Sequence, residues 1–177
     1  MLRSIFLFIL ISPLLFSQEK TDQNVWQPLQ YFVGEWEGHS TGKSREGNGG
    51  RVYKFIMNDM FLYYQNTMKF DPQEKNPKGD FHEDRTFYSY DKNRNLIVVR
   101  QFNIEGFINQ FVLDSLSSDQ KTLIFITESS ENAPPGLKAR LIYEIENENE
   151  FVETFELGFT GKEFSCWMIN HWKRKVE

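Results

Sequence analysis

The chain has 177 residues, of which 40% are hydrophobic and 16% aromatic, which is enough to bury one sizeable core. Its formal net charge of −5 argues against the basic surface that nucleic-acid phosphates need, so we predict no nucleic-acid partner. A single cysteine, Cys166, excludes an internal disulfide framework and a cysteine-rich zinc site, and we expect it to be a small buried hydrophobe.

Residues 1–17 have the pattern of a secretory signal peptide. Arg3 gives a short basic start, the run from Ser4 to Phe16 is almost wholly apolar, and the chain turns polar at Ser17. The apolar run is shorter than the ~20 residues of a membrane-spanning helix, so we predict cleavage near Ser17 and no membrane span. The mature chain, residues 18–177, would then be a single domain exported to a periplasm or to the medium.

A short helix is predicted before the first strand. Trp26, Leu29 and Phe32 follow one another at helical spacing after polar residues that can cap a helix. Pro28 fits only a first helical turn, so the segment predicts one or two turns of α- or 3₁₀-helix. Trp36 is the one large side chain in the middle of the first predicted strand, and we expect it to fill one end of the fold. The helix should cover that same end.

Ten strand-like segments follow at regular spacing, rich in β-branched and aromatic residues and separated by turn residues. Asp71–Arg85, with its prolines and charges, predicts a solvated loop or mobile lid. The predicted strands are Gly34–Thr41, Arg51–Met57, Met60–Phe70, Thr86–Tyr90, Leu96–Phe102, Phe107–Leu113, Lys121–Thr127, Leu137–Ile145, Phe151–Phe159 and Glu163–Lys173.

These strands predict an all-β fold, a closed antiparallel meander β-barrel of about ten strands with a short N-terminal helix. No helical pattern separates the strands, which argues against strand–helix–strand units. The alternative is an open sandwich, but an open arrangement of so many strands would leave long unpaired edges.

Two short motifs resemble those of a known group. Gly34-Glu35-Trp36 after a short helix resembles the Gly-x-Trp opening of the calycins, which include lipocalins, fatty-acid-binding proteins and nitrobindin-like barrels. Trp167–Lys175 is similar to the closing strand of that group, and the resemblance implies that Arg174 packs over Trp36 as a cation–π contact. Asp84–Asp114 also resembles part of an exported bacterial domain family of unassigned function within the group.

Alternation along the last strands predicts which side chains face the barrel interior. The predicted inward sets are Ala139, Leu141, Tyr143 and Ile145; Phe151, Glu153, Phe155, Leu157 and Phe159; and Phe164, Cys166, Met168, Asn170, Trp172 and Arg174. Glu153 is the one carboxylate among apolar neighbours, and a buried carboxylate needs a partner. The predicted partner is Arg100, in an ion pair that is either structural or orients a ligand.

The calycin resemblance implies a barrel that binds a small hydrophobic or amphipathic molecule, a step that rests on fold analogy. Apolar walls with a few directed polar groups are typical of such sites. The predicted ligand-binding residues are Arg100, Gln110, Tyr143, Glu153, Phe155 and Met168, and the predicted closure residues are Gly34, Trp36 and Arg174. A barrel whose interior is filled, acting through its loops as an interaction module, remains the alternative.

A nitrobindin-like barrel would bind heme through one histidine near the C-terminus, so the resemblance offers His171 as a heme ligand. The predicted register instead places His171 outside, and the leading prediction is a protein without cofactor or metal. Glu35, Glu37 and His39 alternate on one strand face, which is typical of a solvated face or a weak metal site. No nucleophile elbow, phosphate loop or zinc-protease motif occurs, so we predict no enzyme activity.

Overall fold

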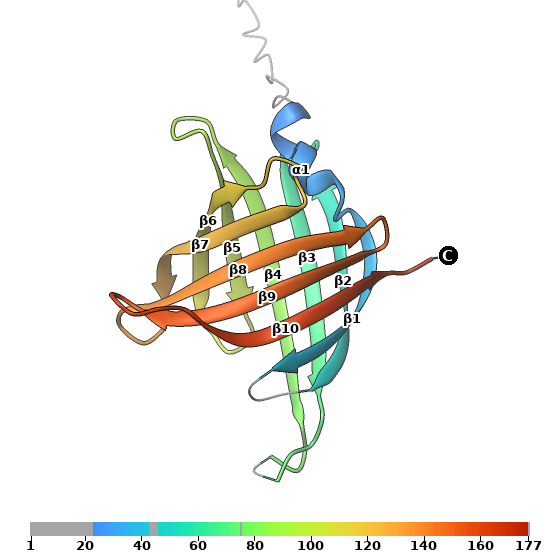
Figure 1. Ribbon diagram of the computed structural model, residues 1–177, viewed down its shortest axis with the longest axis vertical. Coiled ribbons are helices and arrows are strands. Elements are labelled where there is room, and N and C mark those ends of the chain that lie inside the picture. The colour runs from blue at the N-terminus through green and yellow to red at the C-terminus, as the bar shows by residue number, and fades with distance from the viewer. Residues whose placement is uncertain (1–22, 43–45, 75, 177) are drawn as a thin grey trace, which may run out of the picture.

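The computed structural model describes residues 23–42, 46–74 and 76–176. Ten antiparallel strands form one sheet that closes on itself, each pairing with its neighbours in the chain and β1 pairing with β10 (Figure 1). The predicted closed meander barrel is therefore confirmed, and the open sandwich is not formed. The predicted signal peptide, residues 1–17, lies outside the described residues.

The elements agree in number and order with the prediction. A 3₁₀ turn, η1 (Gln23–Trp26), leads into α1 (Gln27–Gln30). The strands are β1 (Gly34–Gly42), β2 (Gly47–Ile56), β3 (Phe61–Phe70), β4 (Asp80–Asp91), β5 (Leu96–Asn103), β6 (Ile108–Leu116), β7 (Thr122–Glu131), β8 (Leu137–Asn147), β9 (Glu150–Phe159) and β10 (Ser165–Arg174).

β2 and β4 begin well before their predicted starts at Arg51 and Thr86. β2 includes Gly47, Gly49 and Gly50, because glycine lets the strand pass very close to β3: a Cβ at Gly49 would lie 2.0 Å from the Thr67 carbonyl oxygen. β4 takes in Asp80–Arg85, which pair in register with the second half of β3. The second part of the predicted lid is thus a strand. The sequence predicts a loop there because it is rich in charged residues.

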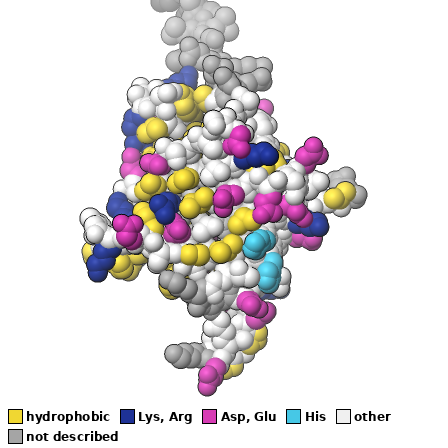
Figure 2. All heavy atoms as spheres, viewed as in Figure 1, with side chains coloured by type: hydrophobic (Ala, Val, Ile, Leu, Met, Phe, Trp, Pro, Cys, Tyr) yellow, Lys and Arg dark blue, Asp and Glu magenta, His cyan; other side chains and the backbone are white. Residues whose placement is uncertain are grey.

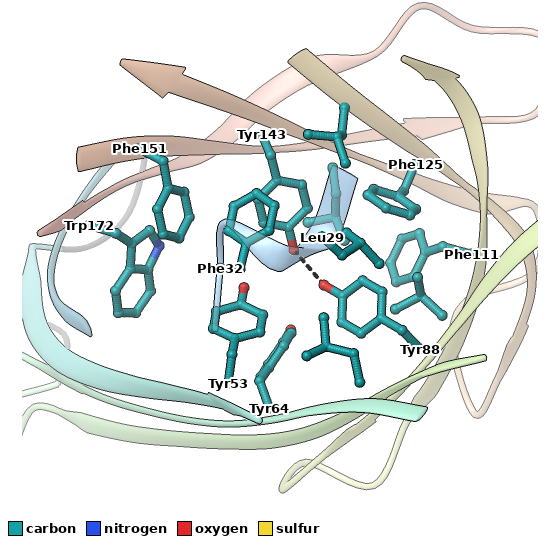
Figure 3. Packing of buried hydrophobic residues seen from close by; sticks show 14 of the residues in the cluster. Leu29, Phe32, Tyr53, Tyr64, Tyr88, Phe111, Phe125, Tyr143, Phe151 and Trp172 are labelled. Atoms are coloured by element: carbon teal, nitrogen blue, oxygen red, sulfur yellow. Dashed lines mark hydrogen bonds between the residues drawn. The ribbon is translucent and has the colours of Figure 1, made fainter. Parts of the chain in front are cut away.

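One end of the barrel, which we call the closed end, is covered by η1 and α1 (Figure 1). Leu29 and Phe32 point from the helical segment into the barrel and lie among the rings of surrounding strands (Figure 3). The Phe32 ring centroid lies 5.0 Å from that of Phe151 and 5.4 Å from that of Tyr143. This half of the interior is therefore packed with side chains, and it confirms the predicted helical cover.

Trp36 and Arg174 close the barrel where β1 meets β10. Trp36 is fully buried and donates a hydrogen bond from Nε1 to the Phe32 carbonyl oxygen at 2.7 Å. The Arg174 guanidinium lies 4.2 Å from the Trp36 ring centroid and donates to the Val33 carbonyl at 2.8 Å. Gly34 has φ +125°, and a Cβ there would lie 3.0 Å from Arg174 Nη1. The predicted closure residues Gly34, Trp36 and Arg174 thus lie together at this seam.

The predicted faces hold over most of β8, β9 and β10, where Leu141, Glu153 and Asn170 are buried and His171 is exposed. The face prediction is wrong at Phe159, which is 48% exposed because β9 ends there. It also fails at the start of β10, where an irregularity between Cys166 and Met168 shifts the register. The Cys166 side chain is accordingly only half-buried.

Candidate functional site

The end opposite the helix, which we call the open end, holds a cavity of about 280 Å³ inside the barrel. Its apolar wall consists of Met68, Phe70, Phe107, Leu141, Phe155, Trp167 and Met168. Its polar lining consists of Arg51, Asn66, His82, Asp84, Gln101, Asn103, Glu105, Asn109, Glu153 and Asn170. The two halves of the interior thus differ: one is filled by rings, and the other is hollow and partly polar.

A buried ion pair between Arg51 and Glu153 forms the floor of the cavity. The two side chains meet through paired hydrogen bonds, the second of which joins Arg51 Nη2 to Glu153 Oε1 at 3.3 Å. The Arg51 guanidinium lies between the rings of Tyr64 and Trp172, 4.5 and 4.3 Å from their centroids. Burial alone would lower the pKa of Arg51, but the Glu153 carboxylate and the neighbouring tyrosines together outweigh burial, so the pKa is raised and the group stays charged.

Burial raises the pKa of the nearby tyrosines. The Tyr53 hydroxyl accepts a hydrogen bond from Arg51 Nη1 at 3.0 Å, and desolvation raises its pKa to about 12. The Tyr88 and Tyr143 hydroxyls, 3.4 Å apart and joined by the dashed line in Figure 3, have pKa values raised well above the usual range for the same reason. These phenols therefore stay protonated and form the boundary between the polar floor and the filled half.

A second polar cluster surrounds Asp84 on the β4 side of the cavity. Its carboxylate accepts from Asn66 Nδ2 at 2.7 Å and from Thr86 Oγ1 at 3.1 Å. His82 lies at the rim, with Nε2 3.4 Å from Asp84 Oδ2 and Nδ1 2.8 Å from Glu105 Oε1. Asn66 also accepts from Arg51 Nε at 3.3 Å, so the two clusters form one connected network.

Asn170 of β10 has one buried polar atom left over. Its Nδ2 donates to Glu153 Oε1 at 3.0 Å, while its Oδ1 has no hydrogen-bond partner among the described residues. Asn170 is 2% exposed and lines the cavity. A buried acceptor without a partner costs free energy, so an N–H or O–H donor brought to this oxygen would be stabilised.

The pH dependence of stability tests this network. Burial lowers the pKa of His82, but its hydrogen bonds to Asp84 and Glu105 outweigh burial and raise it. Burial raises the pKa of Asp84, but His82, Arg51 and Asn66 outweigh burial and lower it. His82 therefore contributes fully to the free energy of unfolding below about pH 6.5, the pKa of histidine in an unfolded chain. This contribution is lost as pH rises through the raised pKa of His82 in the folded protein. Asp84 contributes to the free energy of unfolding above about pH 3.9, the pKa of aspartate in an unfolded chain. This contribution is lost as pH falls through the lowered pKa of Asp84 in the folded protein.

Both contributions therefore coexist between about pH 4 and 6.5. We expect His82→Gln to flatten the decline in unfolding free energy between pH 6 and 8, measured by urea denaturation. His39→Gln, on the exposed outer face, is the matched control and should keep the wild-type slope. An unchanged slope in His82→Gln would contradict the assignment.

The cavity contains three of the six predicted ligand-binding residues: Glu153, Phe155 and Met168. Tyr143 faces inwards but lies in the filled half. The prediction that Arg100 partners Glu153 is wrong: Arg100 is exposed on the outer face and donates to Ser89 Oγ at 3.2 Å. Gln110 also faces outwards, where it donates to Glu128 at 2.6 Å.

Sequence reasoning missed Arg51, Asn66, Asp84 and Asn170 as site residues. Arg51 alternates with Tyr53 and Phe55, so the period-two pattern of β2 could have placed it inside. Asp84 belongs to the predicted lid, whose charge-rich sequence is typical of a solvated segment. No residue of the connection between β3 and β4 lines the cavity within the described chain, so a lid role for 71–79 stays a prediction.

The histidines of β1 and β10 lie outside the cavity. His39 and His171 are directly opposite each other on the outer face, where histidine side chains lie together (Figure 2). His171 therefore cannot bind a heme held inside the barrel. Within 23–42, 46–74 and 76–176, no group of three or more histidine, cysteine or acidic side chains is placed to hold a metal ion. Glu35, Glu37 and His39 are exposed on the outer face of β1.

None of the helices in the described ranges is long and apolar enough to cross a membrane. No protein-family model matches the chain, and no curated protein matches it. Solved structures do: the crystal structure of Rv2717c from M. tuberculosis aligns with a TM-score of 0.63 over 85% of this chain and 97% of that one. At 16% identity, the likeness shows that the two chains share a fold.

Proposed function

We propose that this protein binds a small apolar or amphipathic molecule non-covalently in the open-end cavity. The observation that carries the proposal is the contrast inside one barrel: rings fill the closed end, whereas the open end keeps a cavity with an apolar wall and a fixed polar floor. Pockets for small molecules have this composition. The calycin resemblance, with its ligand-binding barrels, supports the same proposal by analogy.

The cavity also limits the ligand. Its volume of about 280 Å³ corresponds to roughly ten water molecules at ~30 Å³ each. That volume lies just below the ~300–1,000 Å³ typical of small-molecule sites. The ligand we propose is therefore a single ring or short chain with one polar end, smaller than a long fatty acid.

The filled-barrel alternative describes only half of the interior, since the closed end alone is packed. The heme alternative would need a ligand other than His171, whose side chain lies on the outer face. Export also belongs to the proposal: it rests on the signal-peptide pattern of residues 1–17, and the intact mass of the exported chain would show whether it begins at Gln18.

Calorimetric titration with phenethyl alcohol, a neutral probe that fits the cavity, tests the proposal. We expect saturable one-to-one binding by wild type and at least a tenfold loss in Met168→Trp, because the larger side chain fills the cavity. Ile169→Trp is the matched control, since the neighbouring residue faces outwards on the same strand, and it should keep wild-type affinity. Equal affinity in the two variants, or no saturable binding by wild type of this alcohol or of the amine and carboxylate that share its ring, would contradict the proposal.

A further inference from the structure

We infer that the ligand carries a hydrogen-bond-donating, positively charged end, as a small aromatic or alkyl primary amine does, and that Asn170 Oδ1 accepts from it. The inference rests on the proposed function and adds the chemical class of the ligand. It depends on three features of the cavity: a free acceptor of fixed orientation, an excess of carboxylates over free cations, and an apolar wall beside them.

The acceptor has a fixed orientation because its neighbour fixes the amide. Asn170 Nδ2 donates to Glu153 Oε1 at 3.0 Å, and a flipped amide would turn its oxygen towards that carboxylate. The Oδ1 atom therefore points away from Glu153, and it has no partner among the described residues. A carbonyl oxygen only accepts, so the ligand group that satisfies it must be an N–H or O–H donor.

The charges favour a cation over an anion. The cavity lining contains three carboxylates, Asp84, Glu105 and Glu153, and its described cationic groups are Arg51 and His82. Both cations are already engaged, Arg51 by Glu153 and His82 by Asp84 and Glu105. A carboxylate ligand would meet like charges without a free cation to pair with, whereas an ammonium would add the missing positive charge.

The apolar wall next to the floor suits the remainder of such a ligand. Met68, Leu141, Phe155 and Met168 line the cavity, and thioether and ring surfaces adapt well to a flat ring or a short chain. The Trp167 ring stands at the cavity and is 42% exposed. Aromatic faces attract cations, so this ring can also assist the approach of an ammonium group.

The test uses three probes that each carry a phenyl ring and differ in their polar end: phenethylamine, phenethyl alcohol and phenylacetate. Each is titrated into wild-type protein at pH 7, and the affinities show whether a cation, a neutral group or an anion is preferred. We expect phenethylamine to bind about tenfold or more tightly than the alcohol, as charge-assisted hydrogen bonds predict, and phenylacetate to bind most weakly. If phenylacetate or the alcohol binds as tightly as the amine, the inference is overturned while the proposed function stands. If none of the three probes binds, both the proposed function and this inference are contradicted.

Asn170→Ala then locates the contact. We expect it to weaken phenethylamine about tenfold or more and phenylacetate little, because only a donor uses the Asn170 oxygen. Asn48→Ala, an exposed asparagine on the outer face of β2, is the matched control and should keep wild-type affinity for the amine. Equal losses for amine and acid in Asn170→Ala would overturn the assignment of the contact, and the wild-type ranking of probes holds even if that variant folds poorly.

Discussion

Replacing Glu153 by glutamine is expected to lower the free energy of unfolding by about 3–5 kcal/mol, because it leaves Arg51 charged in the barrel without its anion. The pair has side chains only 3% and 6% exposed, so the Arg51 guanidinium would remain largely shielded from water after the carboxylate is lost. Urea denaturation at pH 7 measures the loss. Since small domains have total stabilities of about 5–15 kcal/mol, the variant should unfold at a much lower urea concentration.

Glu83→Gln is the matched control, because Glu83 pairs with Arg85 at 2.8 Å on the outer surface. Exposed pairs contribute about 0–1 kcal/mol, so this variant should remain close to wild type. The double variant Arg51→Met, Glu153→Leu should be less destabilised than Glu153→Gln, since it removes both buried charges. Equal stability of Glu153→Gln and Glu83→Gln would show that the pair is not isolated from water.

Trp36→Ala is expected to cost about 3–5 kcal/mol, the range for removing a large buried ring. The substitution removes the hydrogen bond to the Phe32 carbonyl, the contact with Phe151 at 4.7 Å between ring centroids, and the surface on which Arg174 packs. Because the same ring joins the helix to the β1–β10 seam, we expect the covering segment to detach as well. Hydrogen exchange at the amide groups of η1 and α1 should then increase.

Trp167→Ala is the control for the size of the lost ring. Trp167 is 42% exposed at the open end, so its removal should cost much less than the removal of Trp36. If the two tryptophan variants lose equal stability, or if Trp36→Ala leaves hydrogen exchange in the helical segment unchanged, Trp36 does not close the barrel.

The general fold could be predicted from the sequence because its signals are local. Turn residues recur at short intervals, and period-two alternation marks the inward faces of β8 and β9. Those features depend on neighbouring residues, so they can be recognised without knowledge of the rest of the barrel. The meeting of Trp36 with Arg174 is instead implied by the calycin resemblance, since the two residues are far apart in the chain.

The polar floor could not be predicted in the same way, because its partners are far apart in the chain. Arg51 and Glu153 are separated by 102 positions, and sequence alone favoured Arg100, which a strand register places on the outer face. The charged residues around Asp84 favour a loop prediction, although Asp84 lies in β4. The glycines at the start of β2 favour a loop prediction in the same way. Only the closure of β1 on β10 brings these groups to one cavity.

The same closure explains how the two halves differ in role. The aromatic half supplies the burial that holds the sheet together, and burial of apolar surface is the main stabilising term in folding. The polar half keeps buried charges, a free acceptor and empty volume, all of which reduce stability. Features that cost stability and converge on one cavity are typical of a binding site.

The central claim is that a small molecule enters the open-end cavity and no other part of the barrel. Methyl NMR of labelled methionines, recorded during titration with phenethylamine, tests it most directly. Met68 and Met168 line the cavity, whereas Met57 and Met60 lie at the β2–β3 turn at the closed end. The account predicts saturable shifts of the Met68 and Met168 signals with those of Met57 and Met60 unchanged; unchanged Met68 and Met168 signals, or shifts confined to Met57 and Met60, would contradict it.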